Sequence, residues 1–134
     1  VTDYIAHRTS DKVKISTHVP DSLPPVRLNV ALFEWVIENL CKNAVDAMGG
    51  VGVLVISVQE TSRYWCIDVE DTGKGIDKRY FETVFAPGYT TKKRGWGLGL
   101  SLARRIVVEY HSGSIFVKQS EINKGTIFRI ELKK

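Results

Sequence analysis

The spacing of apolar residues divides the chain into segments of strand and helix character. Residues 12–19 alternate apolar and polar side chains, which predicts a half-buried strand. Beyond a loop that contains three prolines, apolar residues recur at helical spacing from about residue 29 to 48, with Asn29 as a candidate N-cap and two glycines after the end. Residues 52–59 and 64–70 are then predicted to be two strands joined by a short polar turn.

The pattern changes after these strands. Residues 71–99 are rich in glycine and have no long apolar period, so a loop is predicted for most of this segment. A loop of this length inside a compact domain usually has a functional role. Residues 98–110 form an amphipathic helical pattern, and two closing strands are predicted at 114–119 and 125–132, joined by a turn. This order of elements predicts an α+β fold, with helices on one face of a mostly antiparallel sheet.

Composition narrows the class of protein without identifying it. The chain has 134 residues, of which 43% are apolar and 25% are charged, so we expect one globular domain covering residues 1–134. No apolar run approaches the ~18 residues of a membrane span, and the first residues lack the apolar core of a signal peptide. We therefore expect a soluble, cytoplasmic domain, and a membrane anchor elsewhere in a longer parent chain stays open.

The cysteines argue against a metal-binding or disulfide-bonded protein, and the charge argues against a nucleic-acid-binding one. Cys41 and Cys66 lie inside apolar patterns without metal-binding spacing, which predicts reduced, buried thiols. The net charge of +4 is mild, and the basic run at residues 92–94 is too short for a nucleic-acid-binding face. We therefore expect no nucleic-acid partner.

One face of the first predicted helix is polar where an apolar stripe would be ordinary. Asn39, Lys42, Asn43 and Asp46 follow one another at i, i+3, i+4 and i+7, a spacing that lines a single face. A face turned to solvent explains this pattern without any function. Two asparagine oxygens side by side would also suit a hard cation such as Mg²⁺, which shares its coordination between protein, water and phosphate oxygens.

Two glycine-rich motifs lie in the long loop. Residues 71–75, with the sequence DTGKG, follow directly on a predicted strand, where glycines let the backbone approach a flat ligand and Asp71 can accept a hydrogen bond from an exocyclic amine. Residues 94–101 form a second glycine run that opens a helix, a position suited to phosphate. A capped tight turn and simple helix capping are the alternative explanations. Neither motif matches a dinucleotide fingerprint or a Walker loop.

The residues between the two glycine motifs combine aromatic, glycine and basic side chains. This mixture predicts a hinged flap over about residues 76–95 rather than a packed element. Phe81 and Phe85 are also expected to anchor the loop by local hydrophobic contact.

Taken in order, these motifs resemble those of the GHKL ATPase superfamily and, within it, the sensor histidine kinases. Residues 38–44 resemble the asparagine box, 71–75 the first glycine box, 84–92 the phenylalanine box and 95–100 the second glycine box. The pair Gly125-Thr126 resembles the closing GT of the family. The resemblance implies a Bergerat fold, a two-layer α/β sandwich in which a mixed, mostly antiparallel sheet packs against about three helices, with a long ATP lid.

The resemblance also implies ATP and Mg²⁺ as ligands. Asp71 would bind the adenine amine, and Thr126 would reach the adenine directly or through water. Asn43 would coordinate Mg²⁺ with the assistance of Asn39, and Lys42 or Lys92 would contact phosphate. The implied catalytic residues are Asn39, Asn43 and Lys92. The implied nucleotide-binding set is Asn39, Lys42, Asn43, Asp46, Asp71, Gly73, Gly75, Ile76, Phe85, Thr91, Lys92, Gly95, Gly97, Leu98, Gly99, Leu100 and Thr126.

One position favours a kinase over a hydrolase. Hydrolysing members of the superfamily, such as gyrase, have a glutamate four residues before the metal-binding asparagine, to activate water. Here that position is Asn39, whose amide cannot take a proton from water. Glu38 is adjacent but rotated by about 100° around the helix. We therefore expect phosphoryl transfer to a protein side chain.

The sequence contexts of His7, His18 and His111 do not suit a phosphate acceptor. The resemblance therefore implies a separate histidine-bearing dimerisation domain, expected before residue 1, and a response regulator as partner in a two-component system. We expect this chain alone to be a monomer and the full-length kinase a homodimer. A GHKL serine/threonine protein kinase and a nucleotide-sensing domain without transfer activity stay open as alternatives.

Overall fold

The computed structural model describes residues 13–18, 30–87 and 99–134 of the chain. The elements in these ranges are β1 (Val13–His18), α2 (Val30–Ala47), β2 (Gly52–Glu60), β3 (Tyr64–Asp71), η1 (Lys78–Tyr80), η2 (Thr83–Phe85), α3 (Gly99–Arg105), η3 (Ile106–Tyr110), β4 (Ser114–Glu121) and β5 (Gly125–Lys133). All seven of the longer predicted elements are found, and their ends differ from the predicted ones by at most two residues when α3 and η3 are counted together. The candidate N-cap Asn29 lies outside the described residues.

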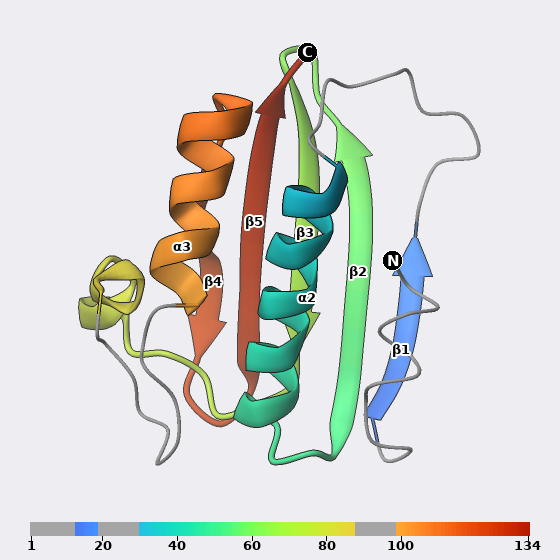
Figure 1. Ribbon diagram of the computed structural model, residues 1–134. Coiled ribbons are helices and arrows are strands. Elements are labelled where there is room, and N and C mark those ends of the chain that lie inside the picture. Colours follow the sequence, from blue (N-terminus) through green and yellow to red (C-terminus); the bar gives the residue numbers. More distant parts are fainter. Residues whose placement is uncertain (1–12, 19–29, 88–98) are drawn as a thin grey trace.

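The strands form one five-stranded sheet in the order β1-β2-β3-β5-β4. The edge strand β1 runs parallel to β2, and the other three pairs are antiparallel. Figure 1 shows α2 and α3 lying side by side on one face of this sheet. The parallel pair follows from the connection through α2, because a helical crossover returns the chain to the same end of the sheet. The predicted two-layer α+β sandwich is therefore confirmed.

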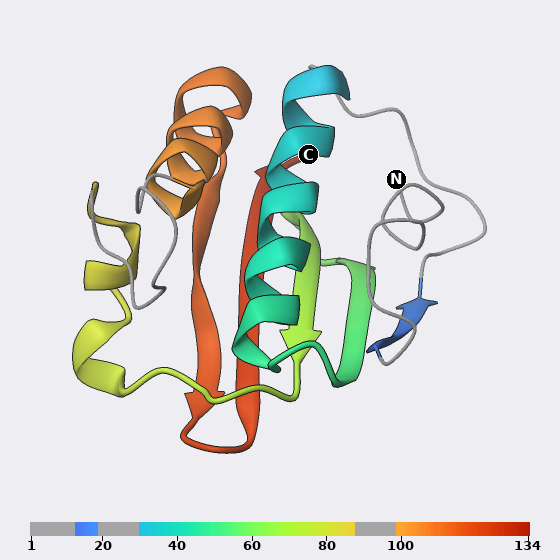
Figure 2. The same cartoon turned by 60° about the horizontal axis from the view of Figure 1, so that its bottom comes forward.

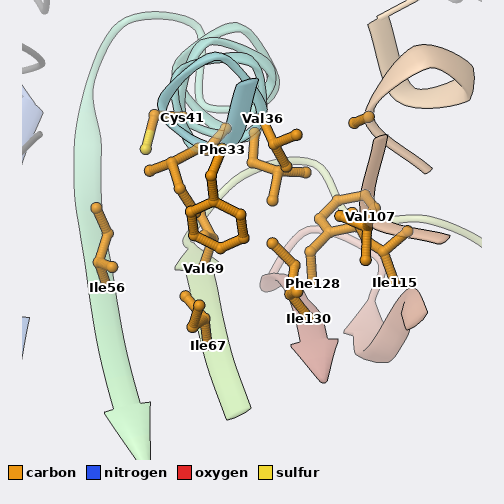
Figure 3. Close-up of a cluster of buried hydrophobic side chains, with 14 of the residues drawn as sticks. Phe33, Val36, Cys41, Ile56, Ile67, Val69, Val107, Ile115, Phe128 and Ile130 are labelled. Atoms are coloured by element: carbon orange, nitrogen blue, oxygen red, sulfur yellow. The ribbon is translucent and has the colours of Figure 1, made fainter. Parts of the chain in front are cut away.

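The core fills the space between the sheet and the two helices. Alternate strand residues point toward the helices, so Leu54, Val69 and Ile130 are almost fully buried, as are Val36 and Leu40 on the facing side of α2. Figure 3 shows these layers meeting, with the side chains of α2 directed at the strands.

Both cysteines are free and buried, as predicted. Burial, with a smaller contribution from the charge of Glu38, raises the pKa of the Cys41 thiol to about 12. Cys41 therefore stays protonated at neutral pH and acts as a small core side chain. Among the helices that the structure describes, none is long and apolar enough to cross a membrane.

The second predicted helix differs from a continuous α-helix. Within the predicted segment, only α3 (Gly99–Arg105) is α-helical. The segment η3 continues it as a π-helix over Ile106–Tyr110. The wider turn allows Ile106 and Val107 both to be buried while Tyr110 is 64% exposed. The ring of His111 follows, with Nδ1 3.1 Å from the Ile106 carbonyl and the ring edge-on to Phe33.

Candidate functional site

A buried carboxylate lies at the end of the central strand. Asp71 is the last residue of β3 and pairs with Leu54 on β2 and with Thr126 on β5, so strands flank it on both sides. Its side chain belongs to the helix-covered face and is only 4% exposed. Its Oδ1 accepts a hydrogen bond from the Gly73 N–H at 2.8 Å. A sheet interior rarely holds such a group without a partner, so the surroundings of this carboxylate decide what it can do.

Those surroundings hold no compensating positive charge in the part of the chain that the structure describes. Burial raises the pKa of Asp71 above its ordinary value, the main-chain hydrogen bonds of Gly73 and Thr126 act in the opposite direction, and the charge of Glu70 raises it slightly. Within the described part of the chain, no cation contributes to this balance. The carboxylate therefore keeps acceptor capacity for an external donor such as an amine.

Thr126 and the end of β4 complete the surroundings of this carboxylate. Thr126 is 3% exposed, and its Oγ1 lies 2.7 Å from Ser120 Oγ. The same serine oxygen accepts a hydrogen bond from the Ile76 N–H at 2.7 Å and donates to the Gly125 carbonyl at 3.1 Å. Ile76, directly after the first glycine motif, is thus connected to Thr126 on β5 through one hydroxyl. Sequence reasoning identified Ile76 and Thr126 but missed Ser120.

A β-bulge explains why Ser120 was missed. The β4–β5 pairing shifts register between Val117 and Gln119, so that Ser120 pairs with Thr126. Strict alternation from Val117 would direct Gln119 toward the helices and Ser120 away from them. The extra residue reverses this order. Only the strand pairing, which the chain pattern does not show, carries this information.

The first glycine motif lies against the β4–β5 turn (Figure 2). Gly75 has φ +78°, and a Cβ at this position would collide with the carbonyl oxygen of Glu121. The Asn123 N–H donates to the Lys74 carbonyl at 2.8 Å. At the other side, the Lys74 N–H donates to the carbonyl of Ala47, the last residue of α2, at 3.0 Å. The motif is therefore held between the end of a helix and a hairpin turn, which explains the requirement for glycine.

The polar stripe on α2 approaches the start of α3. A Cβ at Gly99 would lie 2.5 Å from Asn39 Oδ1, so the two motifs are in contact, and a larger residue at this position would require the Asn39 side chain to move. Asn39 and Asn43 are half-buried, whereas Lys42 and Asp46 are exposed. Lys42 Nζ forms an ion pair of 3.0 Å with Glu38. The solvent-facing explanation of the stripe therefore holds for the exposed residues Lys42 and Asp46. It fails for Asn39, which is half-buried and contacts the start of α3.

Part of the predicted flap is packed. Residues 76–87 contain η1 and η2, and Phe85 at the end of η2 is 4% exposed. Its ring contacts Phe128 edge-on at 6.0 Å, and the Arg104 guanidinium lies 4.7 Å from its centre. Arg104 also forms an ion pair of 2.5 Å with Glu82. The hinged-flap prediction is therefore wrong for this part, because an aromatic contact and an ion pair hold it to the core and to α3.

The expected anchoring of the loop by Phe81 and Phe85 is confirmed, because both pack into or against the core. A contact between Phe85 and a nucleotide stays a prediction. Leu100 also packs against the core from α3. The remaining predicted residues, Thr91, Lys92, Gly95, Gly97 and Leu98, lie outside the described residues.

The residues present fit an adenine nucleotide. Asp71 offers a buried acceptor to an amine, with Thr126 beside it, and the first glycine motif brings its main chain close to Asp71. The half-buried amide oxygens on α2 are the oxygen donors that Mg²⁺ accepts. Within the described ranges, no group of three or more His, Cys, Asp or Glu side chains could hold a metal ion.

Comparison with known proteins identifies the family. Residues 29–134 match the family of histidine kinase-, DNA gyrase B-, and HSP90-like ATPases, and the chain belongs to this family. The arrangement of sheet and helices is thus the Bergerat sandwich that the motifs predict. Membership implies that the chain binds ATP.

The curated relatives include a sensor histidine kinase and a sporulation kinase. The chain is 35% identical to the sensor histidine kinase ZraS of Escherichia coli K12 over 123 residues, 92% of this chain and 26% of ZraS. It is 37% identical to sporulation kinase C of Bacillus subtilis over 97 residues, 72% of this chain and 22% of that kinase. The chain thus spans about a quarter of the length of these relatives.

Solved structures support the same family. The catalytic domain of histidine kinase ThkA has a TM-score of 0.81 and 27% identity, covering 99% of this chain and 86% of that domain. A structure of ThkA in complex with the response regulator protein TrrA has a TM-score of 0.78 at 25% identity, covering 99% of this chain and 36% of the ThkA chain. The mycobacterial sensor histidine kinase MprB, at 20% identity and TM-score 0.84 over 98% of this chain and 88% of its own, shares the fold.

Proposed function

We propose that this chain is the catalytic domain of a sensor histidine kinase, which binds Mg²⁺-ATP and transfers the γ-phosphoryl group to a histidine on a separate dimerisation domain. The observation that carries the proposal is Asp71, a buried carboxylate with spare acceptor capacity beside Thr126. The kinase relatives ZraS and sporulation kinase C supply the reaction class.

Asp71 and Thr126 bind and orient the adenine. The N–H groups of Gly73 and Thr126 both donate to the carboxylate, whose oxygens still have lone pairs for the exocyclic amine of the base. A hydrogen bond to a charged acceptor at a buried position contributes about 1.5–3 kcal/mol, so this contact is expected to dominate recognition of the base. The rigid strand pairing around Asp71 provides orientation, which is the main contribution of a protein to phosphoryl transfer.

Asn43, with Asn39, would hold Mg²⁺ from the half-buried part of the α2 stripe. The ion supplies charge neutralisation on the phosphates when bound. Lys42, paired with Glu38, and Lys92 are the proposed phosphate-contacting cations. The contact between Asn39 and Gly99 joins this stripe to the beginning of α3.

The region around Asn39 favours transfer over hydrolysis. An amide at this position cannot accept a proton from water. The neighbouring carboxylate of Glu38 forms an ion pair with Lys42 at 3.0 Å, and its side chain is 19% exposed. Because Lys42 occupies this carboxylate and Glu38 lies about 100° around the helix from Asn39, Glu38 is a poor replacement for the glutamate of the hydrolysing relatives.

The acceptor histidine is proposed to belong to a dimerising domain of a longer, homodimeric protein, with this domain on the cytoplasmic side where ATP is present. His111 supports this view, because its ring packs against Phe33 and its Nδ1 faces the Ile106 carbonyl. A response regulator would receive the phosphoryl group afterwards, and the complex of ThkA with TrrA supports such a partner.

A phosphotransfer assay tests this proposal. The chain is mixed with the separately expressed histidine-bearing domain of its parent protein, Mg²⁺ and γ-labelled ATP, and the labelled product is treated with acid. We expect an acid-labile, base-stable label on that domain, which is the behaviour of phosphohistidine. An acid-stable label would indicate a serine/threonine kinase, and ATP binding without label would indicate a nucleotide-sensing domain.

Asn43→Asp tests the assignment of the metal site in the same assay. We expect loss of transfer and weaker Mg²⁺-dependent ATP binding. Asn123→Asp, the same substitution in the exposed β4–β5 turn, is the matched control and should retain both. Equal activity of the two variants would contradict the role of Asn43.

A further inference from the structure

The Ser120 hydroxyl is the shared partner of three groups around the base-binding residues. Its Oγ lies 2.7 Å from the Ile76 nitrogen, 2.7 Å from Thr126 Oγ1 and 3.1 Å from the Gly125 carbonyl oxygen. Ser120 is half-buried, and Thr126 is 3% exposed. At such positions each hydrogen bond is well defined, because water competes little for the same groups.

Counting donors and acceptors gives a direction to every bond in this cluster. A serine hydroxyl has one proton to donate and two lone pairs to accept with. The Ile76 N–H can only donate, and the Gly125 carbonyl can only accept. The single proton of Ser120 therefore goes to the carbonyl, and Thr126 must be the donor to Ser120. The hydrogen-bonding capacity of the Ser120 hydroxyl is then full.

This direction limits what Thr126 can offer to a ligand. Its only hydroxyl proton is directed at Ser120, so that the remaining capacity of Oγ1 is that of an acceptor. Thr126 is the register partner of Asp71 across β3 and β5, and the ionised Asp71 carboxylate is also only an acceptor. Two neighbouring acceptors would meet any base edge placed between them.

We propose that Ser120 is a positioning residue that fixes the orientation of the Thr126 hydroxyl, and thereby makes the site selective for purines with a 6-amino group over those with a 6-oxo group. This inference rests on the proposed function, because it assumes that the base lies at Asp71. With the 6-position of the base between the two acceptors, an amine donates one proton to each of them. A 6-oxo group would instead place a third acceptor there, and the N1–H of such a base, which lies beside the 6-position, could reach at most one of the two. A site with unpaired buried polar groups rejects such an analogue strongly.

Inosine triphosphate is the appropriate probe, because it is the 6-oxo analogue of ATP with the same sugar and triphosphate. ATP and inosine triphosphate are titrated, with Mg²⁺, into the wild-type chain and into Ser120→Ala. In the variant the Thr126 hydroxyl can rotate and donate to the 6-oxo group. We expect the ratio of the two Kd values, inosine triphosphate over ATP, to fall about three- to tenfold, the range that one net hydrogen bond allows.

Two controls separate orientation from general damage. Ser114→Ala makes the same change at the exposed start of β4 and should leave the ratio unchanged. Ser120→Thr keeps the hydroxyl and should restore the wild-type ratio. A merely structural role for Ser120 would weaken binding of both nucleotides equally, and would leave their ratio where it was.

Thr126→Val provides a second route to the same conclusion. Removing this hydroxyl should also lower the ratio, and adding Ser120→Ala to it should have no further effect on the ratio, because both changes act through one group. If Ser120→Ala does not fold, Ser120→Cys takes its place, since a thiol is a weak donor and acceptor.

The outcomes distinguish this inference from the proposal on which it rests. Failure of the wild-type chain to bind ATP would contradict the proposed function and the inference together. Binding of ATP with a wild-type ratio in the Ser120 variant, or with equal affinity for both nucleotides in the wild type, would overturn the inference alone.

Discussion

Strand β3 carries two buried aspartates, one on each face of the sheet, and their surroundings differ in kind. Asp68, on the face opposite the helices, receives both Nε and an Nη of Arg129 at 2.7 and 2.9 Å, and Lys118 lies 3.6 Å away. Asp71, three residues later on the helix-covered face, is held by the N–H groups of Gly73 and Thr126. The exposed fractions of the two residues are similar, 7% and 4%.

Burial alone therefore does not distinguish a functional carboxylate from a structural one. The charge of Asp68 is neutralised within the sheet, so its acceptor capacity is used by the fold. Asp71 has its charge stabilised only by main-chain dipoles in the described part of the chain, and burial still raises its pKa. A carboxylate in this condition gains most from an external donor. This difference is the physical reason to place the base at Asp71.

The largest effect is expected from separating Asp68 from its partner. Arg129→Ala leaves a buried carboxylate with only the more distant Lys118, so the free energy of unfolding should fall by about 3 kcal/mol. ATP affinity should change little. Arg105→Ala is the matched control, because the Arg105–Glu109 pair is exposed, and it should cost about 0.5 kcal/mol or less. Equal losses in denaturant titrations of the two variants would show that the Asp68 pair is not structural.

A smaller loss is expected on the Asp71 side from the glycine motif. Gly75→Ala places a Cβ against the Glu121 carbonyl and forces an unfavourable φ, so stability should fall by about 2 kcal/mol and ATP binding should weaken with it. Gly49→Ala shares the positive φ, +66°, but has open space around the new Cβ. This control should cost about 1 kcal/mol and leave ATP binding intact. Thermal unfolding with and without Mg²⁺-ATP measures both effects.

The smallest effect concerns pH, and its sign differs between stability and binding. Because the pKa of Asp71 is raised in the folded chain, the stability linked to its proton is present below the ordinary value of 3.8 and is lost as pH rises through the raised pKa. ATP binding needs the ionised form, so affinity should fall as pH decreases through the same range.

Asp71→Asn isolates both pH effects, since the variant has no carboxyl at this position. The difference in free energy of unfolding between wild type and variant should change by at most about 1.4 kcal/mol per pH unit, the limit for one proton. Parallel pH profiles of the two proteins, for both stability and ATP affinity, would show that Asp71 does not titrate in this way.

Much of this comparison could be predicted from the sequence, and some of it could not. The strands and α2 follow from local periodicity, and Asp71 was identifiable because it ends an apolar strand and begins a glycine motif. The structural role of Asp68 was not visible, because Arg129 is distant along the chain and becomes its partner only through the register of β3 and β5.

The same limit explains the other differences. The bulge that directs Ser120 toward Thr126 depends on how β4 pairs with β5. The burial of Phe85 depends on a contact with Phe128, which lies on β5. Both depend on tertiary contacts between segments far apart in sequence, for which a local pattern carries no signal.

Mg²⁺-ATP titration of the pair Asp71→Asn and Asp68→Asn tests the central claim most directly. The two substitutions are identical and lie on the same strand, but only one removes the proposed base acceptor. The account predicts that Asp71→Asn weakens ATP binding about tenfold or more with little loss of stability, because it removes a charged acceptor. Asp68→Asn should retain wild-type affinity while lowering the free energy of unfolding. Equal ATP affinity of Asp71→Asn and the wild type, or loss of binding in the Asp68 variant alone, would contradict it.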